Sequence, residues 1–285
     1  AQSAYITLDV VEALKARVYL EMEDYQNAAA AAQGLINSKR YTLISDGDAY
    51  KKMWLNDVGT EAIWQFAMSK TETGSNALGS SFMGIVDKLP RPSYLPVKSV
   101  LNLYDKENDI RYDAYFTTGL IDRQVGDDIE VTYCSKWPGN PELYEGKSNN
   151  VNKLKAFRIS EMYLIAAEAY AMLNQEDKAS EMLNELKKIR IKGWTETVYN
   201  GAALMQEIQD ERVRELFAEG NRLFDMKRWK IGMKRSSSDA QRDDYLPALG
   251  TDIEKEATDN RWVWPIPKDE MDSNPQLKGQ QNPGY

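Results

Sequence analysis

The sequence predicts a mainly α-helical protein in which antiparallel helix pairs repeat around a loop-rich insertion and an irregular tail follows them. Three observations support this fold class. Apolar and small residues recur at helical spacing near residue 15 and again near residue 165. These two regions resemble each other at a constant offset of 151 residues. The last fifty residues contain Asn-Pro and Pro-Gly pairs, through which no helix can continue.

The first helix pair is expected in residues 1–39, because this region shares its pattern with a later one. In each copy a polar turn separates two helices, and small side chains let antiparallel helices pack closely. The positions that match at the offset are small, aromatic or apolar: Ala16 with Ala167, Tyr19 with Tyr170, Ala28 with Ala179, and Ala32 with Leu183. This is the helix–turn–helix unit of tetratricopeptide-like repeats.

Residues 40–155 differ in character and are interpreted as an insertion that carries the candidate ligand region. Within it, Trp54 and Trp64 are expected to pack in a core. Residues 96–104 suggest a short helix that begins after a proline, and the alternation over residues 129–133 predicts a strand. Residues 71–81 are rich in Gly and Ser, which is typical of a mobile loop.

The segment Lys136 to Pro141 is the candidate for ligand recognition. A site for a small ligand that has both an apolar face and polar edges combines an aromatic platform with polar donors and acceptors. An indole in a turn that contains Pro and Gly is easily preorganised, which favours Trp137 as the platform. The alternative is that Trp137 packs against the helices beneath it. The remaining candidates are aromatic and polar neighbours: Tyr133, Tyr144, Asn140, Arg123, Asp127 and Asp128.

Residues 156–235 are expected to complete the helical repeats, with helices over residues 158–169 and 211–229. Gly220 interrupts the second helix pattern and is interpreted as a point where another backbone approaches closely. Charged residues there follow i,i+3 spacing. They form either an active site or a structural ion network, and the network is favoured because nearby guanidinium groups lower carboxyl pKa values. The structural residues are Glu211, Arg212, Glu215, Glu219, Arg222, Asp225, Arg228 and Trp229.

Composition excludes several classes of function. The chain has 285 residues with 36 Lys plus Arg against 44 Asp plus Glu, a net charge of −8, so nucleic acid is not an expected partner. It has no histidine, and its single cysteine, Cys134, allows neither an intrachain disulfide nor a thiolate metal cluster. We therefore predict no metal and no cofactor. No apolar stretch reaches roughly 18 residues, so this part of the chain is expected to be soluble.

Residues 236–285 are predicted to form a loop and an ordered, proline-rich tail laid over the rest of the protein. Prolines fix its turns, and large apolar residues such as Trp264 and Ile266 can anchor it. Its pattern, W-P-I-P…E…N-P…Q-N-P-G-Y, resembles the carboxyl terminus of the SusD/RagB family. The E-R…E-L…E-G-x-R…D-x-x-R-W pattern of residues 211–229 is similar to a fold signature of that family, and residues 104–111 resemble its Y…D-x-R turn.

The resemblance implies a SusD-like α-α superhelix in a single domain over residues 1–285. It also implies binding without catalysis: capture of a glycan or other small nutrient at the outer-membrane surface, and delivery to a SusC-like TonB-dependent transporter. Family members begin with a lipid-modified cysteine and a further amino-terminal stretch. We therefore expect a lipid anchor outside this chain, and part of the ligand site in that stretch.

Two other classes of function stay open. A tetratricopeptide-like scaffold for a protein or peptide would bind its ligand in a groove lined by the repeat helices. A glycoside hydrolase would need two carboxylates about 5 to 9.5 Å apart across a cleft, and no Asp or Glu spacing in the sequence singles out such a pair.

Overall fold

The computed structural model describes residues 5–71, 78–86, 88–123, 126–145, 150–242, 254–277 and 279–285. Contacts within the chain divide it into two compact units, Ala1–Glu219 and Gly220–Tyr285, called the N-terminal and C-terminal units below. The boundary falls inside the segment 211–229, which the sequence pattern assigned to one helix. The expectation of a single domain over residues 1–285 stays a prediction.

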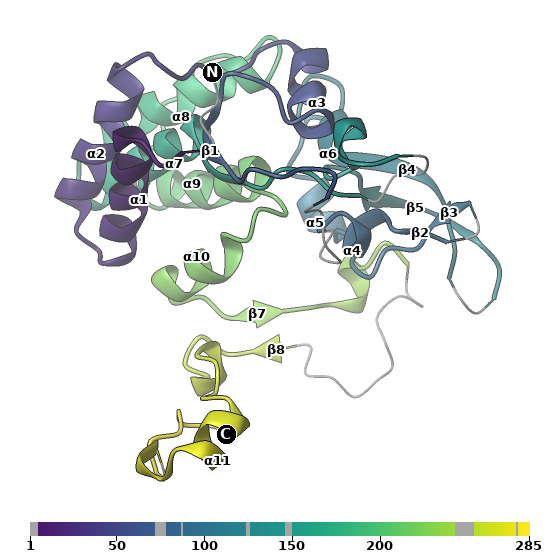
Figure 1. Ribbon diagram of the computed structural model, residues 1–285. Helices are drawn as coiled ribbons and strands as arrows, with labels where there is room; N and C mark the ends of the chain where they lie inside the picture. Colours follow the sequence, from purple (N-terminus) through teal and green to yellow (C-terminus); the bar gives the residue numbers. More distant parts are fainter. Residues whose placement is uncertain are drawn as a thin grey trace. The chain divides into compact units, whose positions relative to one another are not determined.

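The helical repeat is present in the N-terminal unit, as predicted (Figure 1). The first pair is α1 (Leu8–Glu21) with α2 (Tyr25–Asn37), and the second is α7 (Ile159–Met172) with α8 (Glu176–Arg190). The 151-residue offset places α1 on α7 residue for residue, and the first residue of α2 on that of α8.

The turns between the paired helices are also equivalent at this offset. Glu23 and Asn174 both have left-handed backbone conformations, with φ of 58° and 57°. The N–H groups that follow them, on Asp24 and Gln175, both donate to a tyrosine carbonyl at 2.9 Å, that of Tyr19 or Tyr170. The two copies of the repeat are therefore similar down to individual hydrogen bonds.

Helix α7 lies in the centre of the helical core. It packs against α1, α2, α8 and α9 (Gly201–Glu215), and Figure 1 shows these five helices side by side. Small residues at the contacts, including Ala13, Ala28 and Ala167, are completely buried. Since alanine adds little width to a helix, the axes can approach closely, as the sequence predicted for repeats of this kind.

One two-stranded sheet encloses most of the insertion. Strand β1 (Ala62–Gln65) pairs antiparallel with β6 (Lys155–Arg158), which returns the chain to the start of α7. Between them, β4 (Phe116–Ile121) and β5 (Ile129–Cys134) form an antiparallel pair, so the strand expected at residues 129–133 is confirmed. The other elements of the insertion are short: α3 (Gly47–Leu55), α4 (Ser80–Met83), β2 (Ile85–Val86), β3 (Leu89–Pro90), α5 (Lys98–Leu101), α6 (Tyr112–Tyr115) and a 3-10 helix at Pro141–Leu143.

Two further expectations for the insertion have clear outcomes. The helix expected over residues 96–104 is only α5, which is one turn long. Trp54 is 1% exposed, so its packing role is confirmed, whereas Trp64 is half-buried. Residues 72–77 of the expected mobile loop lie outside the described residues.

The prediction of one continuous helix over residues 211–229 is wrong. Helix α9 ends at Glu215, and α10 (Arg222–Trp229) begins after a turn in which Ala218 has φ 57° and Gly220 has φ 85°. Gly220 is therefore explained by its own backbone conformation, which L residues rarely adopt. A Cβ atom at Gly220 would meet no described heavy atom within 4 Å, so the expected close approach of another backbone is also wrong.

The C-terminal unit holds the ordered tail. Besides α10 it contains β7 (Met233–Lys234) paired with β8 (Glu254–Lys255), α11 (Lys268–Ser273), and 3-10 helices at Ser237–Asp239, Asn260–Trp262 and Pro275–Leu277. The Gln281 side chain accepts from the Ile266 N–H at 2.8 Å and donates to the Ile266 carbonyl at 3.1 Å. Asn282 donates to the Trp264 carbonyl. These hydrogen bonds hold the end of the chain against the Trp264–Ile266 backbone, where the prolines prevent a helix.

Candidate functional site

The segment predicted to recognise the ligand is buried. Trp137 is 2% exposed and packs edge-on against Trp54, with ring centroids 5.1 Å apart. Its Nε1 donates to the carbonyl of Ala218 at 3.2 Å. The expectation that Trp137 is an exposed sugar platform is therefore wrong, because the indole finds both its aromatic contacts and its acceptor inside the N-terminal unit. The alternative, that Trp137 has a packing role, is correct.

The adjacent lysine has a related structural role. Lys136 is completely buried, and its ammonium lies 4.1 Å from the ring centroid of Trp54 and 3.8 Å from that of Tyr115. It donates to the Phe217 carbonyl and to the Glu219 carboxylate, both at 2.7 Å. Burial lowers the pKa of Lys136 to about 8, although Glu219 opposes that shift. Together, residues 136 and 137 hold the turn that ends α9.

The other aromatic and amide candidates near Trp137 are also part of the framework. Tyr133 is 8% exposed and Asn140 is 2% exposed. The Asn140 amide donates to Asp57 at 2.8 Å and to the Asn56 carbonyl at 3.1 Å, and its oxygen caps the 3-10 helix that follows. Tyr144 is half-buried. Because the polar atoms of its side chain are bonded within the fold, Asn140 is not available to a sugar.

The charged residues form the structural network that the sequence favoured. Glu215 on α9 accepts from Arg158 at 2.9 Å, from Arg190 at 2.9 and 3.0 Å, and from Arg111 at 3.0 Å. The carboxylate of Glu61 bridges Arg158 and Arg190 from the other side, at 3.0 and 2.8 Å. All five side chains are at most 1% exposed. The network therefore joins the ends of β6, α8 and α9 to Glu61 and Arg111 of the insertion.

Arg111 extends this network. It makes a two-bond contact with Asp109 and donates to Glu211 at 2.6 Å, and Glu211 also accepts from Arg214 at 2.7 Å. The Glu211–Arg214 pair was expected from i,i+3 spacing. Arg111, Arg158, Arg190 and Glu61 were missed, since they come from distant parts of the sequence. The D-x-R pattern at residues 109–111 was the only signal that could have indicated one of them.

The remaining structural candidates are placed as follows. Arg212 lies 3.9 Å from Glu168 of α7, and Glu219 accepts from Arg158 as well as from Lys136. In the C-terminal unit, the expected pair of Asp225 with Arg228 is present at 2.9 Å. Also in that unit, the guanidinium groups of two arginines lie over the ring of Trp229 at 5.3 and 5.7 Å, those of Arg228 and Arg222 respectively.

The buried carboxylates are unsuited to acid catalysis. Burial opposes their ionisation, but Arg111 and Arg214 outweigh it and lower the pKa of Glu211 to about 2. The pKa of Glu215 is also well below its usual range, because Arg190 and Arg158 outweigh burial. A glycosidase acid needs the opposite shift. Where a described carboxyl group has a pKa clearly displaced from its ordinary value, that pKa is lowered.

An exposed aromatic surface lies next to the buried Trp137 segment. A Cβ atom at Gly79 would lie 2.1 Å from the Trp137 carbonyl oxygen, so only glycine allows α4 to begin against that segment. Helix α4 carries Phe82, whose ring centroid is 6.2 Å from that of Tyr94. Tyr94 is 64% exposed. The rigid core thus positions an aromatic side chain that faces solvent.

Polar residues lie close to this aromatic pair in the chain, and the Arg91 N–H donates to the carbonyl of Gly84, directly after α4, at 2.7 Å. Arg91 donates to Asp122 at 3.0 Å, and the Asp122 N–H donates to the Pro90 carbonyl at 2.9 Å, which joins β3 to the end of β4. Arg123, a candidate from the sequence, follows Asp122 directly and is half-buried. We call Phe82, Arg91, Tyr94, Asp122 and Arg123 the Tyr94 surface. The other two sequence candidates, Asp127 and Asp128, are exposed on the same β4–β5 connection.

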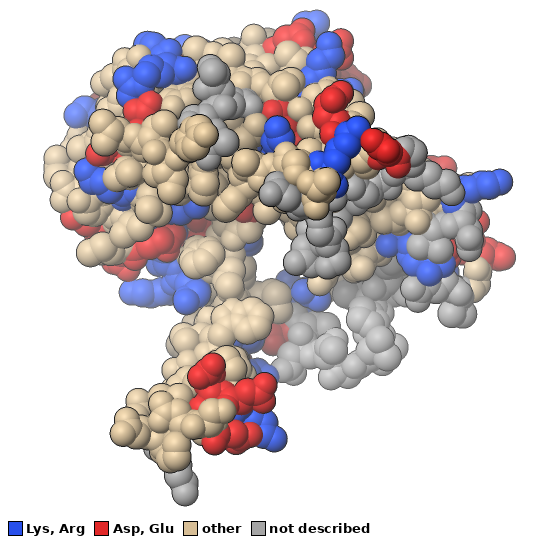
Figure 2. Space-filling model, in the orientation of Figure 1, with Lys and Arg blue, Asp and Glu red and all other residues tan. Residues whose placement is uncertain are grey.

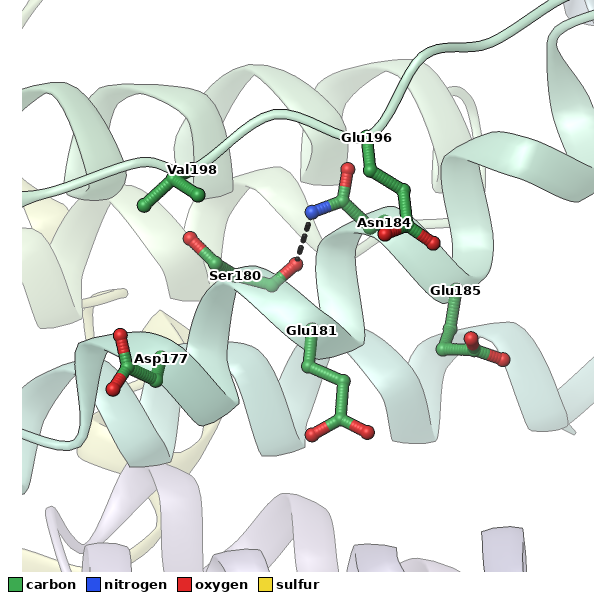
Figure 3. Close-up of a pocket in the computed structure, with 7 residues that line it drawn as sticks. All are labelled: Asp177, Ser180, Glu181, Asn184, Glu185, Glu196 and Val198. Carbon is green, nitrogen blue, oxygen red and sulfur yellow. Dashed lines mark hydrogen bonds between the residues drawn. The ribbon is translucent and has the colours of Figure 1, made fainter.

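A pocket of about 260 Å³ on α8 is a different feature (Figure 3). Asn184 donates to the carbonyls of Ser180 and Thr197, at 2.9 and 2.8 Å, and accepts from the Trp194 indole at 3.0 Å. These bonds attach the segment after α8 to that helix. The carboxylates at its rim do not converge in Figure 3, and no group of three acids or cysteines placed to bind a metal occurs among the described residues. The rim carboxylates are Asp177, Glu181, Glu185 and Glu196.

The visible surface of the helical core does not favour a nucleic acid as partner. On the face of the helical core that Figure 2 shows, basic and acidic side chains are interspersed, without a continuous basic area that would suit a nucleic acid. No helix in the described part of the chain is long and apolar enough to cross a membrane.

Comparison with known proteins identifies the family. The SusD family model matches residues 117–285. SusD-like protein P38 of Formosa agariphila is 25% identical over 93% of this chain and 58% of its own length. A solved SusD superfamily protein from Bacteroides thetaiotaomicron is 28% identical with a TM-score of 0.77, over 98% of this chain and 61% of that one. A solved putative sugar binding protein from Bacteroides vulgatus is 25% identical with a TM-score of 0.72, over 100% and 62%.

This chain spans about three fifths of the length of these relatives. Its family match covers more than half of its residues and includes the broken α9–α10 segment and the proline-rich tail. Because the family match covers more than half of the chain, the chain belongs to the SusD family.

Proposed function

We propose that this protein binds glycan at the cell surface and passes it, chemically unchanged, to a SusC-like TonB-dependent transporter in the outer membrane. Family membership supports the proposal, and one similar solved structure is described as a putative sugar binding protein. This chain spans about three fifths of a relative's length, and the role is proposed for the whole protein. A lipid anchor outside the chain would hold the protein at the membrane.

We assign the glycan contact within this chain to the Tyr94 surface. The observation that carries this assignment is an exposed phenol ring beside Phe82, on the same segment as Arg91, which pairs with Asp122. An aromatic face can stack on the C–H face of a sugar, while guanidinium and carboxylate groups exchange hydrogen bonds with its hydroxyls. Arg123, Asp127 and Asp128 lie on the adjoining connection and keep their proposed binding role.

Binding without catalysis fits the electrostatics of the core. Glu211, Glu215 and Glu219 form the clearest acidic pattern in the sequence, and all three are paired with guanidinium groups. Glu211 and Glu215 are completely buried, and the side chain of Glu219 is 7% exposed. A carboxyl group with a lowered pKa is a poor proton donor near neutral pH. We therefore expect no release of reducing sugar from any glycan that binds.

The experiment has two steps. A glycan array identifies a ligand, and calorimetry then compares the wild type with Tyr94→Ala and Phe66→Ala. Phe66 is 44% exposed and lies just after β1, outside the Tyr94 surface, so it is the matched control. We expect a wild-type Kd in the millimolar to micromolar range, roughly −4 to −8 kcal/mol, and a loss of about tenfold or more for Tyr94→Ala alone.

Two outcomes would contradict the proposal separately. Unchanged binding in Tyr94→Ala would remove the glycan contact from this surface and leave the family function intact. Reducing sugar that accumulates with time, and that a carboxylate substitution abolishes, would contradict binding without catalysis. The transporter step is tested by purifying the membrane-anchored protein and asking whether a SusC-like TonB-dependent transporter is purified with it.

A further inference from the structure

Asn200 and Gly201 form the only Asn–Gly pair in the sequence, and the structure places this pair at the start of α9. Both residues are exposed. Asn200 is the N-cap residue of the helix, but its side chain makes no capping hydrogen bond. Asparagine is favoured at this position because its side-chain oxygen can accept from the first turn of a helix. The Asn200 amide is therefore left accessible where such a side chain is usually bonded.

The backbone on both sides of Asn200 is anchored to α8. The Tyr199 N–H donates to the Ser180 hydroxyl at 2.9 Å, and that hydroxyl donates to the Tyr199 carbonyl at 3.1 Å. The Gly201 N–H donates to the Glu176 carboxylate at 3.0 Å. Gly201 has φ 53°, and a Cβ atom there would meet no described heavy atom within 4 Å. There is therefore open space around the residue that follows Asn200.

The start of α3 offers a comparison within the same protein. Asp46 and Gly47 occupy the N-cap and the first helical position there. The Asp46 carboxylate accepts from the Ala49 N–H at 2.8 Å, so its helix holds this side chain. A Cβ atom at Gly47 would lie 3.7 Å from the Ile110 side chain, so this glycine is packed as well. Both helices thus begin with an extended residue followed by glycine, but the capping bond is present at α3 and missing at α9.

We propose that Asn200 is a site of spontaneous deamidation, in which water is the co-reactant. The Gly201 nitrogen, after losing its proton to hydroxide, attacks Cγ of Asn200. The Cγ–Nδ2 bond breaks, and Nδ2 leaves as ammonia after taking a proton from water. A second water molecule opens the resulting cyclic imide at one of its two carbonyl groups, which gives aspartate or isoaspartate at position 200. Asparagine is a thermolabile residue, and a following glycine has no Cβ atom to obstruct the attack.

Glu176 controls the rate of this reaction. Its carboxylate accepts from the Gly201 N–H, and the attack requires that this N–H is released, deprotonated and turned towards Asn200. A negative charge 3.0 Å from the nitrogen also opposes the formation of an anion there. Both effects slow the attack. Deamidation should therefore be slower in the folded protein than in an unstructured peptide, and removal of the Glu176 charge should accelerate it.

The products change the junction between α8 and α9. Aspartate adds a negative charge close to Glu176, which repels it. Isoaspartate also adds one carbon atom to the backbone between Tyr199 and Gly201. Because both of these residues are bonded to α8, we expect the longer backbone to lose the bond to Ser180 or the bond to Glu176. In the isoaspartate form, the amide hydrogen of Tyr199 or Gly201 should therefore exchange faster with deuterium.

The first experiment compares the two helix starts in one protein. Asp46→Asn creates a second Asn–Gly pair, and asparagine can cap α3 as aspartate does. The variant is incubated at pH 8, and peptide mapping by mass spectrometry measures the conversion of amide to acid at positions 46 and 200. We expect conversion at position 200 to be about fivefold or more faster, because the attack at α3 must first break the capping bond.

A second pair of variants tests Glu176. Glu176→Gln keeps an acceptor for the Gly201 N–H and removes only the charge, so conversion at position 200 should become about fivefold or more faster. Asp177→Asn is the matched control, because Asp177 is exposed in the same first turn of α8 and its replacement changes the net charge equally. In this control the rate should equal that of the wild type.

Three results would overturn the proposal. If position 200 stayed unmodified through about ten half-lives of a synthetic peptide of residues 196–204, the folded protein would not be modified there. Equal rates at positions 46 and 200 would show that the structure does not select Asn200. Equal rates in Glu176→Gln and Asp177→Asn would exclude control by the Glu176 carboxylate. None of these results depends on whether the protein binds glycan.

Discussion

Glu215 and Arg190 form a two-bond ion pair in which neither side chain is exposed. The guanidinium of Arg190 donates from Nε to one carboxylate oxygen of Glu215 at 3.0 Å and from a terminal nitrogen to the other at 2.9 Å. The two residues connect α8 to α9, and Arg158 and Arg111 share the same carboxylate. Four charged side chains therefore meet at a buried junction of elements that are distant in sequence.

Replacing the central carboxylate should strongly destabilise the fold. Glu215→Gln leaves three buried guanidinium groups without their common partner, and an uncompensated buried charge typically costs about 3 to 5 kcal/mol. Urea denaturation should show this loss in the free energy of unfolding. Glu185→Gln is the control, because Glu185 is paired with Lys188 at the surface and its loss should change stability by less than about 1 kcal/mol. Similar midpoints for the two variants would show that the network contributes little.

Stability should fall in acid through the same network. The pKa of Glu211 is about 2 in the folded protein and near 4.5 as its ordinary value, so the folded state binds fewer protons between these values. Its contribution is therefore present above pH 4.5 and is lost as the pH falls towards 2. Thermal melting from pH 6 to pH 2.5 measures this loss. In Glu211→Gln the dependence should be shallower, and an unchanged slope would exclude Glu211 as a source.

Substitution of Trp137 should act on stability rather than on ligand contact. Trp137→Ala removes a buried indole that packs on Trp54 and donates to Ala218, and we expect a loss of about 3 to 5 kcal/mol. Trp137→Phe keeps an aromatic ring but loses the hydrogen bond, so it should cost less. Chemical denaturation measures both. If Trp137→Ala melted like the wild type yet lost glycan binding, the original platform assignment would be restored.

Gly79→Ala tests whether the buried segment positions the Tyr94 surface. The added methyl group would lie 2.1 Å from the Trp137 carbonyl oxygen and 2.8 Å from that of Asn150, so α4 must shift with Phe82. We expect a cost of about 1 to 3 kcal/mol in stability and a weaker affinity for the identified glycan. Gly119→Ala on β4 is the control, because a Cβ there meets no described atom within 4 Å. Equal affinity in both variants would separate α4 from ligand binding.

The sequence determined the repeat, because helix propensity, small-residue spacing and turn chemistry are local properties. The offset of 151 residues that matches Ala16 to Ala167 also predicted the equivalent turns at Glu23 and Asn174. The strand at residues 129–133 and the Glu211–Arg214 pair followed from period and spacing in the same way. Prolines predicted that no long helix continues through the tail, where α11 has six residues and Gln281 fixes the turn at Ile266.

Only the tertiary structure decided which side chains are buried and which charges meet. The segment around Trp137 has the residues and the turn expected of an exposed platform. The indole is nevertheless buried, because it packs on Trp54 and donates to the carbonyl of Ala218, about 80 residues away on either side. The partners of Glu215 lie 25, 57 and 104 residues from it, at positions that no spacing rule connects. The break after α9 depends on the backbone angles at Ala218 and Gly220. Lys136 and Trp137 hold the carbonyls of Phe217 and Ala218 in this turn. Such contacts exist only once the chain has folded, because burial and pairing are properties of packed elements rather than of any one of them.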